Sequence, residues 1–200
     1  MPRYARKAHN PVTVPRYLVN PVYGPTNAAG GSHMFVVLGP MAVDPRNYGS
    51  RTGKMSIPSL MNPLHERDPG GWVAGHLLND NMGGSGVKRQ NLTPLTQTAN
   101  KQHAKLENRV KSMVVIARMF HEGNPEAKFW LGVEYTVKVS AKLFGNFAPY
   151  NHCASHIKVT GRPVKVDKKT KHRAPIHGFH ELQQLAFHER RIENSDAHIL

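Results

Sequence analysis

A change of hydrophobic period near residue 125 constrains the fold of this 200-residue chain more than any other feature. From about Thr98 to Phe120 the apolar residues step by four and three positions, which predicts an amphipathic helix that Gly123 and Pro125 end. Across residues 129–142 apolar and polar residues alternate instead, which predicts a half-buried strand. The apolar face of the helix is Leu106, Val110, Met113, Ala117 and Phe120, and that of the strand is Leu131, Val133, Tyr135, Val137 and Val139.

Shorter apolar runs predict the remaining elements. Residues 34–38 and 72–78 are expected as strands, residues 156–166 as a hairpin around Gly161-Arg162-Pro163, and residues 179–193 as a terminal helix. Four prolines between residues 40 and 71 are expected to exclude regular helix there: Pro45, Pro58, Pro63 and Pro69. The order strand, strand, helix, strand, hairpin predicts an α+β fold, with one long helix on a mixed or antiparallel sheet.

Composition divides the chain into an arm and one domain. Residues 1–32 are rich in Pro, Gly, Asn and Arg without any period, so we expect an extended arm. Residues 33–200 would form the domain, with a strand–turn–helix core at about residues 70–122. Cys153 is the only cysteine, so no internal disulfide can form. No apolar run is long enough to span a membrane, and the first twenty residues lack the apolar stretch of a Sec signal.

The charge balance indicates the class of partner. Lys and Arg number 27 against 13 acidic residues, a formal net charge of +14. Such an excess favours a polyanion, because each phosphate contact releases condensed counterions. Residues 158–173 carry seven basic residues and one acid, which favours a surface that grips a nucleic-acid backbone over a merely solvated hairpin. Charge alone would equally suit a ribosomal-type protein, a membrane-surface binder or a solubility device.

The segment from Trp72 to Lys111 contains residues suited to phosphodiester hydrolysis. That reaction needs a base to take a proton from water and a cation to neutralise the phosphate. His76 follows a glycine, so its backbone can approach a substrate, and it is the candidate base. At about 100° per residue, Asn100, His103 and Glu107 share one stripe of the long helix, and Lys111 continues it. These side chains could hold a hydrated divalent metal and grip a phosphate.

The pattern Gly75-His76, Asn91-Leu-Thr-Pro, Asn100 and Leu106-Glu107 resembles the DNA/RNA non-specific endonuclease family of the ββα-metal (His-Me finger) superfamily. The resemblance implies that His76 activates water and that Asn100 binds Mg²⁺ directly, with Mn²⁺ as a substitute. It also implies that Asn91 positions the site, that Glu107 acts through metal-bound water, and that Lys111 contacts phosphate. The match covers about forty residues.

Two further features of the motif bear on function. The family usually has Asp-Arg before Gly-His, and Val73-Ala74 stands there, so the phosphate-binding arginine must come from elsewhere. The candidates on reach alone are Arg67, Lys88 and Arg89. The run Gly75 to Asn79 is also similar to nuclease domains of bacterial polymorphic toxins. That similarity implies delivery by a specialised secretion system and an acidic immunity protein as partner.

Every candidate residue also has a structural interpretation. His76 could be an ordinary hydrogen-bonded histidine, and Asn91 could cap a turn. Asn100 could satisfy free N–H groups at the helix start, and His103 could be a solvated helix residue instead of a second metal ligand. Glu107 and Lys111 have the spacing of a surface ion pair.

The motif and the charge together predict a metal-dependent nuclease that cuts DNA, or DNA and RNA, without sequence preference. Two alternatives remain: a non-catalytic basic nucleic-acid-binding protein, and an interaction module for an acidic partner. The segment beginning His180-Glu181 resembles the start of a zincin helix, but Gln184 replaces the second histidine, so we do not expect a zinc site there.

Overall fold

The computed structural model describes residues 13–53 and 56–195 and has an α+β fold built on one antiparallel sheet. The sheet has the strand order β1-β4-β7-β8-β10, and β9 pairs with the free part of β8. Its strands are β1 (Tyr17–Tyr23), β4 (His33–Leu38), β7 (Phe129–Val139), β8 (His156–Asp167), β9 (Arg173–Pro175) and β10 (Phe187–Glu193). The predicted α+β class is confirmed, and every pairing in the described part of the chain is antiparallel.

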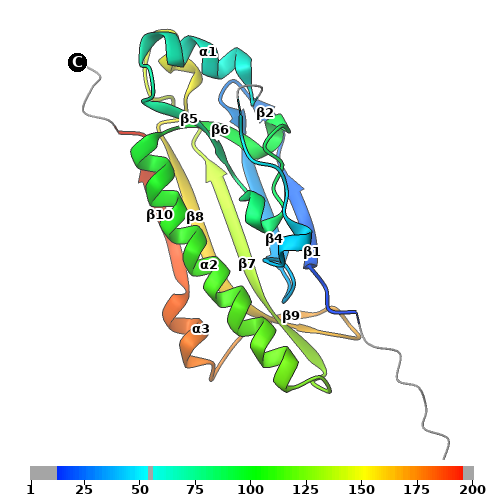
Figure 1. Cartoon of the computed structure of the whole chain (residues 1–200). Coiled ribbons are helices and arrows are strands. Elements are labelled where there is room, and N and C mark those ends of the chain that lie inside the picture. The colour runs from blue at the N-terminus through cyan, green and yellow to red at the C-terminus, as the bar shows by residue number, and fades with distance from the viewer. Residues whose placement is uncertain (1–12, 54–55, 196–200) are drawn as a thin grey trace, which may run out of the picture.

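The long helix α2 (Gln97–Gly123) crosses one face of this sheet (Figure 1). The predicted apolar stripe faces the sheet, with Val110, Met113 and Ala117 fully buried in the main core. The Thr96 side chain begins the helix by accepting a hydrogen bond from the Ala99 N–H at 3.2 Å. The predicted alternation of β7 is also confirmed, since its inward residues lie in the same core.

A second unit of two strands and a helix lies at one end of the sheet (Figure 1). The strands β5 (Trp72–His76) and β6 (Leu92–Thr96) form an antiparallel hairpin, and α2 begins directly after β6. The helix α1 (Pro58–Arg67) covers the hairpin through a small core around Trp72. Asn194 connects the unit to the main sheet: its side chain accepts from the Thr96 N–H at 2.9 Å and donates to the Ala154 carbonyl at 2.8 Å.

Short elements complete the connections. They are β2 (Thr26–Asn27), β3 (Gly30–Gly31), η1 (Pro45–Asn47), η2 (Asp80–Met82), η3 (Arg89–Asn91), η4 (Tyr150–His152) and α3 (His180–Leu185). The 3-10 turns η2 and η3 lie in the loop between β5 and β6, so the hairpin carries a long and structured connection. No helix in the described residues is both long and apolar enough to cross a membrane.

Two expectations for the first seventy residues are corrected. Within the expected arm, residues 1–12 lie outside the described residues, but residues 17–23 form β1, which pairs with β4 at the edge of the sheet. The region between residues 40 and 71 contains α1 despite its prolines. Pro58 occupies the first turn, where its missing N–H costs nothing, and Pro63 removes a single hydrogen bond. Burial of Leu60 and Leu64 stabilises the helix.

Two expectations for the last fifty residues were also wrong. Residues 156–166 form part of one continuous strand, β8, and not a hairpin. One edge of β8 pairs with β7 along its length. The other edge pairs with β10 as far as Gly161 and with β9 from Val164 onward. Pro163 lies between these two partners, where its missing N–H leaves no hydrogen bond unmade. Residues 187–193 form β10 where a helix was expected. A register shift in β10 lets Phe187 and Ile192, five positions apart, both face the core, so the sequence lacks the simple alternation that would have indicated a strand.

Candidate functional site

The β5–β6 hairpin and the first turns of α2, here called the hairpin–helix unit, carry the predicted site residues. His76 is the last residue of β5 and pairs with Leu92, the first residue of β6. Asn91 immediately precedes β6, and its carbonyl accepts from the Leu77 N–H at 2.8 Å. Because α2 starts at the other end of β6, its first turns return alongside the hairpin. Residues 76, 91 and 100–111 therefore belong to one compact unit.

Asn91 is fully buried and holds the loop that follows His76. Its Oδ1 accepts from the Leu78 N–H at 2.8 Å. Its Nδ2 donates to the carbonyls of Leu78 and Ser85, both at 3.0 Å. All three partners are backbone groups, so Asn91 has no polar atom left for a substrate. Asn91 therefore holds the loop that follows His76 through backbone contacts.

The imidazole of His76 is oriented by a backbone carbonyl that the sequence did not indicate. Its Nε2 lies 3.0 Å from the Ser50 carbonyl oxygen. A carbonyl can only accept, so Nε2 carries the proton, and the neutral ring has its lone pair on Nδ1. His76 is half-buried, and its Nδ1 has no hydrogen-bond partner among the described residues. This tautomer is the one that a general base at Nδ1 requires.

The Ser50 carbonyl is itself held firmly in place. The Gly49 N–H donates to the Asp80 carbonyl at 2.7 Å, and the Ser50 N–H donates to the Gly84 carbonyl at 3.1 Å. The Ser50 hydroxyl accepts from the Gly86 N–H at 2.8 Å. A Cβ added at Gly49 would lie 1.9 Å from the Gly84 carbonyl oxygen, so the two loops approach too closely for any side chain. Local sequence patterns carry no signal for such contacts between distant loops.

Glu107 is buried on the site side of α2, with only 4% of its surface exposed. Its Oε2 accepts a hydrogen bond from the Asn79 side chain at 3.0 Å, whereas its Oε1 has no partner among the described residues. Burial raises the pKa of this carboxyl to about 7, and the nearby charges of Lys111 and His76 act in the opposite direction. Glu107, Lys111 and His76 are therefore close enough to interact.

Asn100 and Lys111 lie on the same side of α2 with their polar groups available. The cap at Thr96 removes the need for Asn100 to satisfy the helix start, and its half-buried amide has no hydrogen-bond partner in the described part of the chain. No ion pair joins Lys111 to Glu107, so the surface-pair interpretation of their spacing does not hold. An amide oxygen, a carboxylate oxygen and an ammonium group are thus uncommitted in this site.

His103 differs from its neighbours on the predicted stripe. It is 1% exposed, and its Nε2 lies 2.7 Å from the Tyr135 hydroxyl. Burial lowers the pKa of His103 to about 4 and raises that of Tyr135, so the neutral hydroxyl donates to the neutral ring. The Nε2 lone pair is consumed inside the core. This geometry does not fit the metal-ligand role considered for His103.

The available donors suit a hard cation. No cluster of three or more His, Cys, Asp or Glu side chains that could hold a metal occurs within residues 13–53 and 56–195. The unpartnered Oε1 of buried Glu107 and the free amide of Asn100 are oxygen donors, which Mg²⁺ prefers and zinc does not. The residues present therefore fit a magnesium ion that keeps most of its water.

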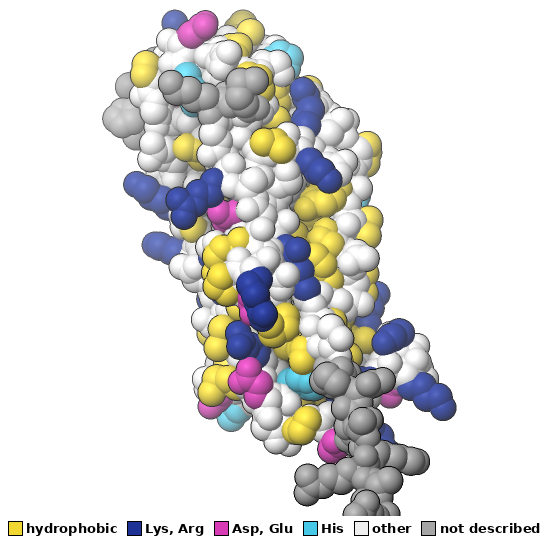
Figure 2. Space-filling model, turned by 45° about the vertical axis from the view of Figure 1, so that its right-hand side comes forward, with side chains coloured by type: hydrophobic (Ala, Val, Ile, Leu, Met, Phe, Trp, Pro, Cys, Tyr) yellow, Lys and Arg dark blue, Asp and Glu magenta, His cyan; other side chains and the backbone are white. Residues whose placement is uncertain are grey.

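The basic run at residues 158–173 is only partly paired with acids. Lys and Arg side chains are spread among acidic and apolar ones over the face shown in Figure 2. In the basic run 158–173, Lys158 pairs with Glu189, while Arg162 and Arg173 both pair with Glu134. Three of the seven basic side chains of the run are thus paired with acids, whereas the lysines form no ion pair among the described residues, with the exception of Lys158. The backbone-gripping surface stays a prediction.

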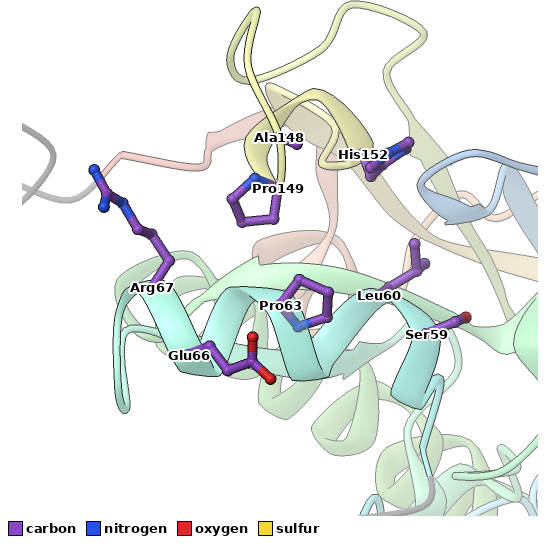
Figure 3. Close-up of a pocket in the computed structure, with 8 residues that line it drawn as sticks. All are labelled: Ser59, Leu60, Pro63, Glu66, Arg67, Ala148, Pro149 and His152. Carbon is purple, nitrogen blue, oxygen red and sulfur yellow. The ribbon is translucent and has the colours of Figure 1, made fainter.

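The two arginines considered as replacements for the missing motif arginine make no hydrogen bond or ion pair with His76, Asn100 or Glu107 in the described part of the chain. Arg89 reaches the Ser59 hydroxyl at 3.5 Å and the Asn27 carbonyl at 3.3 Å. Arg67 lines a cavity of about 470 Å³ between α1 and the loop that contains η4 (Figure 3). None of the predicted site residues lines this cavity. The structure instead brings Arg51 beside the site, with its Nε 3.8 Å from the Asp80 carboxylate.

The architecture belongs to a class of α+β folds found among nucleases. No protein-family model matches the chain, and no curated protein matches its sequence. The chain shares its fold with the structure of Sda1 nuclease with bound zinc ion: the TM-score is 0.50 and the identity 12%, over 90% of this chain and 76% of that one. An extracellular endonuclease matches with a TM-score of 0.45 and 16% identity, over 94% of this chain and 86% of that one.

Proposed function

We propose that this protein is a metal-dependent endonuclease that hydrolyses phosphodiester bonds of DNA, or of DNA and RNA, without sequence preference. One observation carries the proposal: the Ser50 carbonyl leaves the His76 Nδ1 lone pair free, on the same hairpin–helix unit as Glu107 and Lys111. A base, a carboxylate and a cation of this kind match the needs of phosphodiester hydrolysis. The net charge of +14 supports a polyanionic substrate.

The chain's own residues divide the chemistry as follows. His76 Nδ1 accepts the proton from the attacking water, and the Ser50 carbonyl stabilises the resulting imidazolium through Nε2–H. Lys111 binds a phosphate oxygen. Asn100 would hold Mg²⁺ directly and Glu107 would hold it through water. When bound, that ion supplies neutralisation of the phosphate charge and stabilisation of the departing oxygen.

A plasmid-nicking assay tests the role of His76. We expect His76→Ala to lower turnover by at least about 100-fold while binding of nucleic acid survives. The matched control is His188→Ala, which removes an exposed histidine from β10, and it should cleave as the wild type does. Near wild-type cleavage by His76→Ala would remove this residue from the mechanism.

Metal dependence is tested with the same assay on chelated protein. EDTA should abolish cleavage, and Mg²⁺ or Mn²⁺ should restore it, because the free donors are hard oxygens. Full activity in EDTA would contradict a metal mechanism, and restoration by Zn²⁺ alone would contradict the magnesium assignment. Parallel substrates of single-stranded DNA, duplex DNA and RNA establish the substrate range.

The toxin role follows from the motif similarity and is a separate proposal. A toxin nuclease acting on its target's nucleic acid should arrest bacterial growth when it is produced in the cytoplasm. The His76→Ala variant should not. Equal growth of cells that produce the two forms at equal levels would argue against an antibacterial role, and with it against an acidic immunity protein as partner.

A further inference from the structure

The geometry points to Arg51 as a residue that binds a substrate phosphate beside the site, in addition to Lys111 on α2. This inference rests on the proposed function, because it assigns a second contact to the same nucleic-acid substrate. Arg51 lies outside the hairpin–helix unit, in the segment between β4 and α1.

Two contacts place Arg51 beside the proposed chemistry. Its neighbour Ser50 holds the His76 ring at 3.0 Å, and consecutive Cα atoms are about 3.8 Å apart. Its own Nε lies 3.8 Å from Asp80, a residue close enough to Glu107 for their charges to interact. Arg51 therefore directly follows the residue that orients the proposed base, and its guanidinium lies beside Asp80.

The backbone of Arg51 is fixed although its side chain is free. A Cβ added at Gly86 would lie 2.1 Å from the Arg51 carbonyl oxygen, so the two loops are in close contact. The Gly86 N–H also donates to the Ser50 hydroxyl at 2.8 Å. A fixed backbone limits where the guanidinium can reach, which lowers the entropy lost when it binds a substrate.

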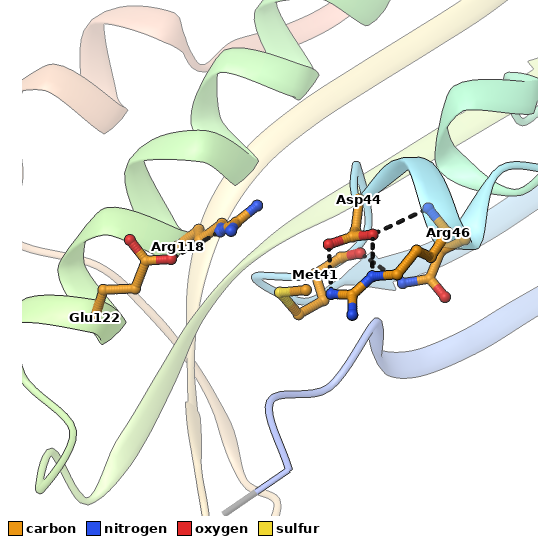
Figure 4. Close-up of polar contacts among 6 residues, drawn as sticks. Met41, Asp44, Arg46, Arg118 and Glu122 are labelled. Carbon is orange, nitrogen blue, oxygen red and sulfur yellow. Dashed lines mark hydrogen bonds and ion pairs between the residues drawn. The ribbon is translucent and has the colours of Figure 1, made fainter.

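The guanidinium of Arg51 is available for a ligand. Its side chain is 93% exposed, and its only described partner is the Asp80 carboxylate, too far away for a hydrogen bond. Its five N–H donors match the paired oxygens of a phosphate. Arg46, in the same segment, contrasts with it. Arg46 donates to both Asp44 oxygens, at 2.8 and 2.9 Å, and is thereby satisfied within the protein (Figure 4).

Arg46 therefore provides a matched control. Its side chain is 80% exposed, so Arg46→Ala and Arg51→Ala make the same change of charge at similarly exposed positions. They differ because only Arg51 lacks a hydrogen-bonded carboxylate and directly follows Ser50, whose carbonyl contacts His76. Arg118 is a less suitable control, because it is paired with Glu122 on α2 at 2.8 Å and is half-buried (Figure 4).

The first measurement is binding without turnover. Each variant is made in the His76→Ala background, and its Kd for a fluorescent single-stranded oligonucleotide is measured in EDTA over a range of salt concentrations. Loss of one phosphate contact should lower the slope of log Kd against log salt by about 0.7 for Arg51→Ala. Arg46→Ala should keep the parent slope, and Arg51→Lys should retain it with weaker binding. Equal slopes for the two alanine variants, or no binding by the parent, would overturn the inference.

The second measurement separates a phosphate contact from a purely electrostatic role through Asp80. In the otherwise wild-type chain, Arg51→Ala should raise KM about tenfold or more, with a smaller effect on kcat. If Arg51 only offsets the charge of Asp80, the double variant Arg51→Ala/Asp80→Asn should regain wild-type KM, and that result would overturn the inference. Continued impairment of the double variant supports it. An absence of cleavage by the wild type would refute the proposed nuclease, while the binding slopes would still decide the role of Arg51.

Discussion

Replacing Glu107 with glutamine should stabilise the metal-free protein at neutral and higher pH. The buried carboxyl has a pKa of about 7, against 4.5 for an unperturbed group. The folded state therefore binds more protons than the unfolded state between these two values. The wild-type protein is therefore most stable below pH 4.5, where Glu107 is protonated in both states. Its unfolding free energy falls as the pH rises through about 7, because the buried carboxyl must then ionise. At about 1.4 kcal/mol per pKa unit, full ionisation costs up to about 3 kcal/mol, and this cost is absent from the variant.

Chemical unfolding in EDTA between pH 4.5 and pH 8 measures this difference. A glutamine oxygen can still accept the Asn79 hydrogen bond, so Glu107→Gln and the wild type should have similar unfolding free energies at pH 4.5. The gap should widen with pH, to as much as about 3 kcal/mol at pH 8. The exposed Glu126→Gln, beyond the end of α2, is the control and should show no such trend.

A pH-independent difference, or a wild type that is the more stable form at pH 8, would refute the reasoning about Glu107. A gain in stability combined with loss of cleavage would support a functional carboxylate, because a buried, partly unpaired charge is retained at a cost to the fold. If Glu107→Gln both stabilises the chain and cleaves normally, Glu107 has no part in metal binding.

Two further substitutions test the supporting contacts. Asn91→Ala leaves three buried backbone groups of Leu78 and Ser85 unpaired, so unfolding free energy should fall by about 3 kcal/mol and cleavage should fall with it. A fall in the unfolding free energy of less than about 0.5 kcal/mol, measured by denaturant titration, would contradict the role of Asn91 in holding this loop. Tyr135→Phe removes the donor to His103 and should cost about 1–3 kcal/mol with little effect on kcat. A large fall in kcat at unchanged stability would instead indicate that His103 takes part in the reaction.

The periodic and motif-like features were readable from the sequence because they depend on neighbours along the chain. The helical stripe around Val110 and the alternation of β7 follow from side-chain geometry repeated every few residues. The spacing from Gly75-His76 to Asn91 and Asn100 likewise indicated one hairpin–helix unit. The same local reasoning failed for β8 and β10, because β8 continues through a proline and a register shift in β10 breaks the alternation that marks a strand.

The tertiary structure alone decided which groups are free to act. Ser50 orients His76 from 26 residues away, and Asn79 holds Glu107 from 28 residues away, so neither contact leaves a local pattern. Burial separated His103 from Asn100, although both share a helix stripe, because only one of them faces Tyr135. Arg51 was left free and Arg46 was not, since a carboxylate lies within hydrogen-bond distance of only one of them. Desolvation and contacts between loops depend on the whole fold, so patterns among neighbouring residues do not predict them.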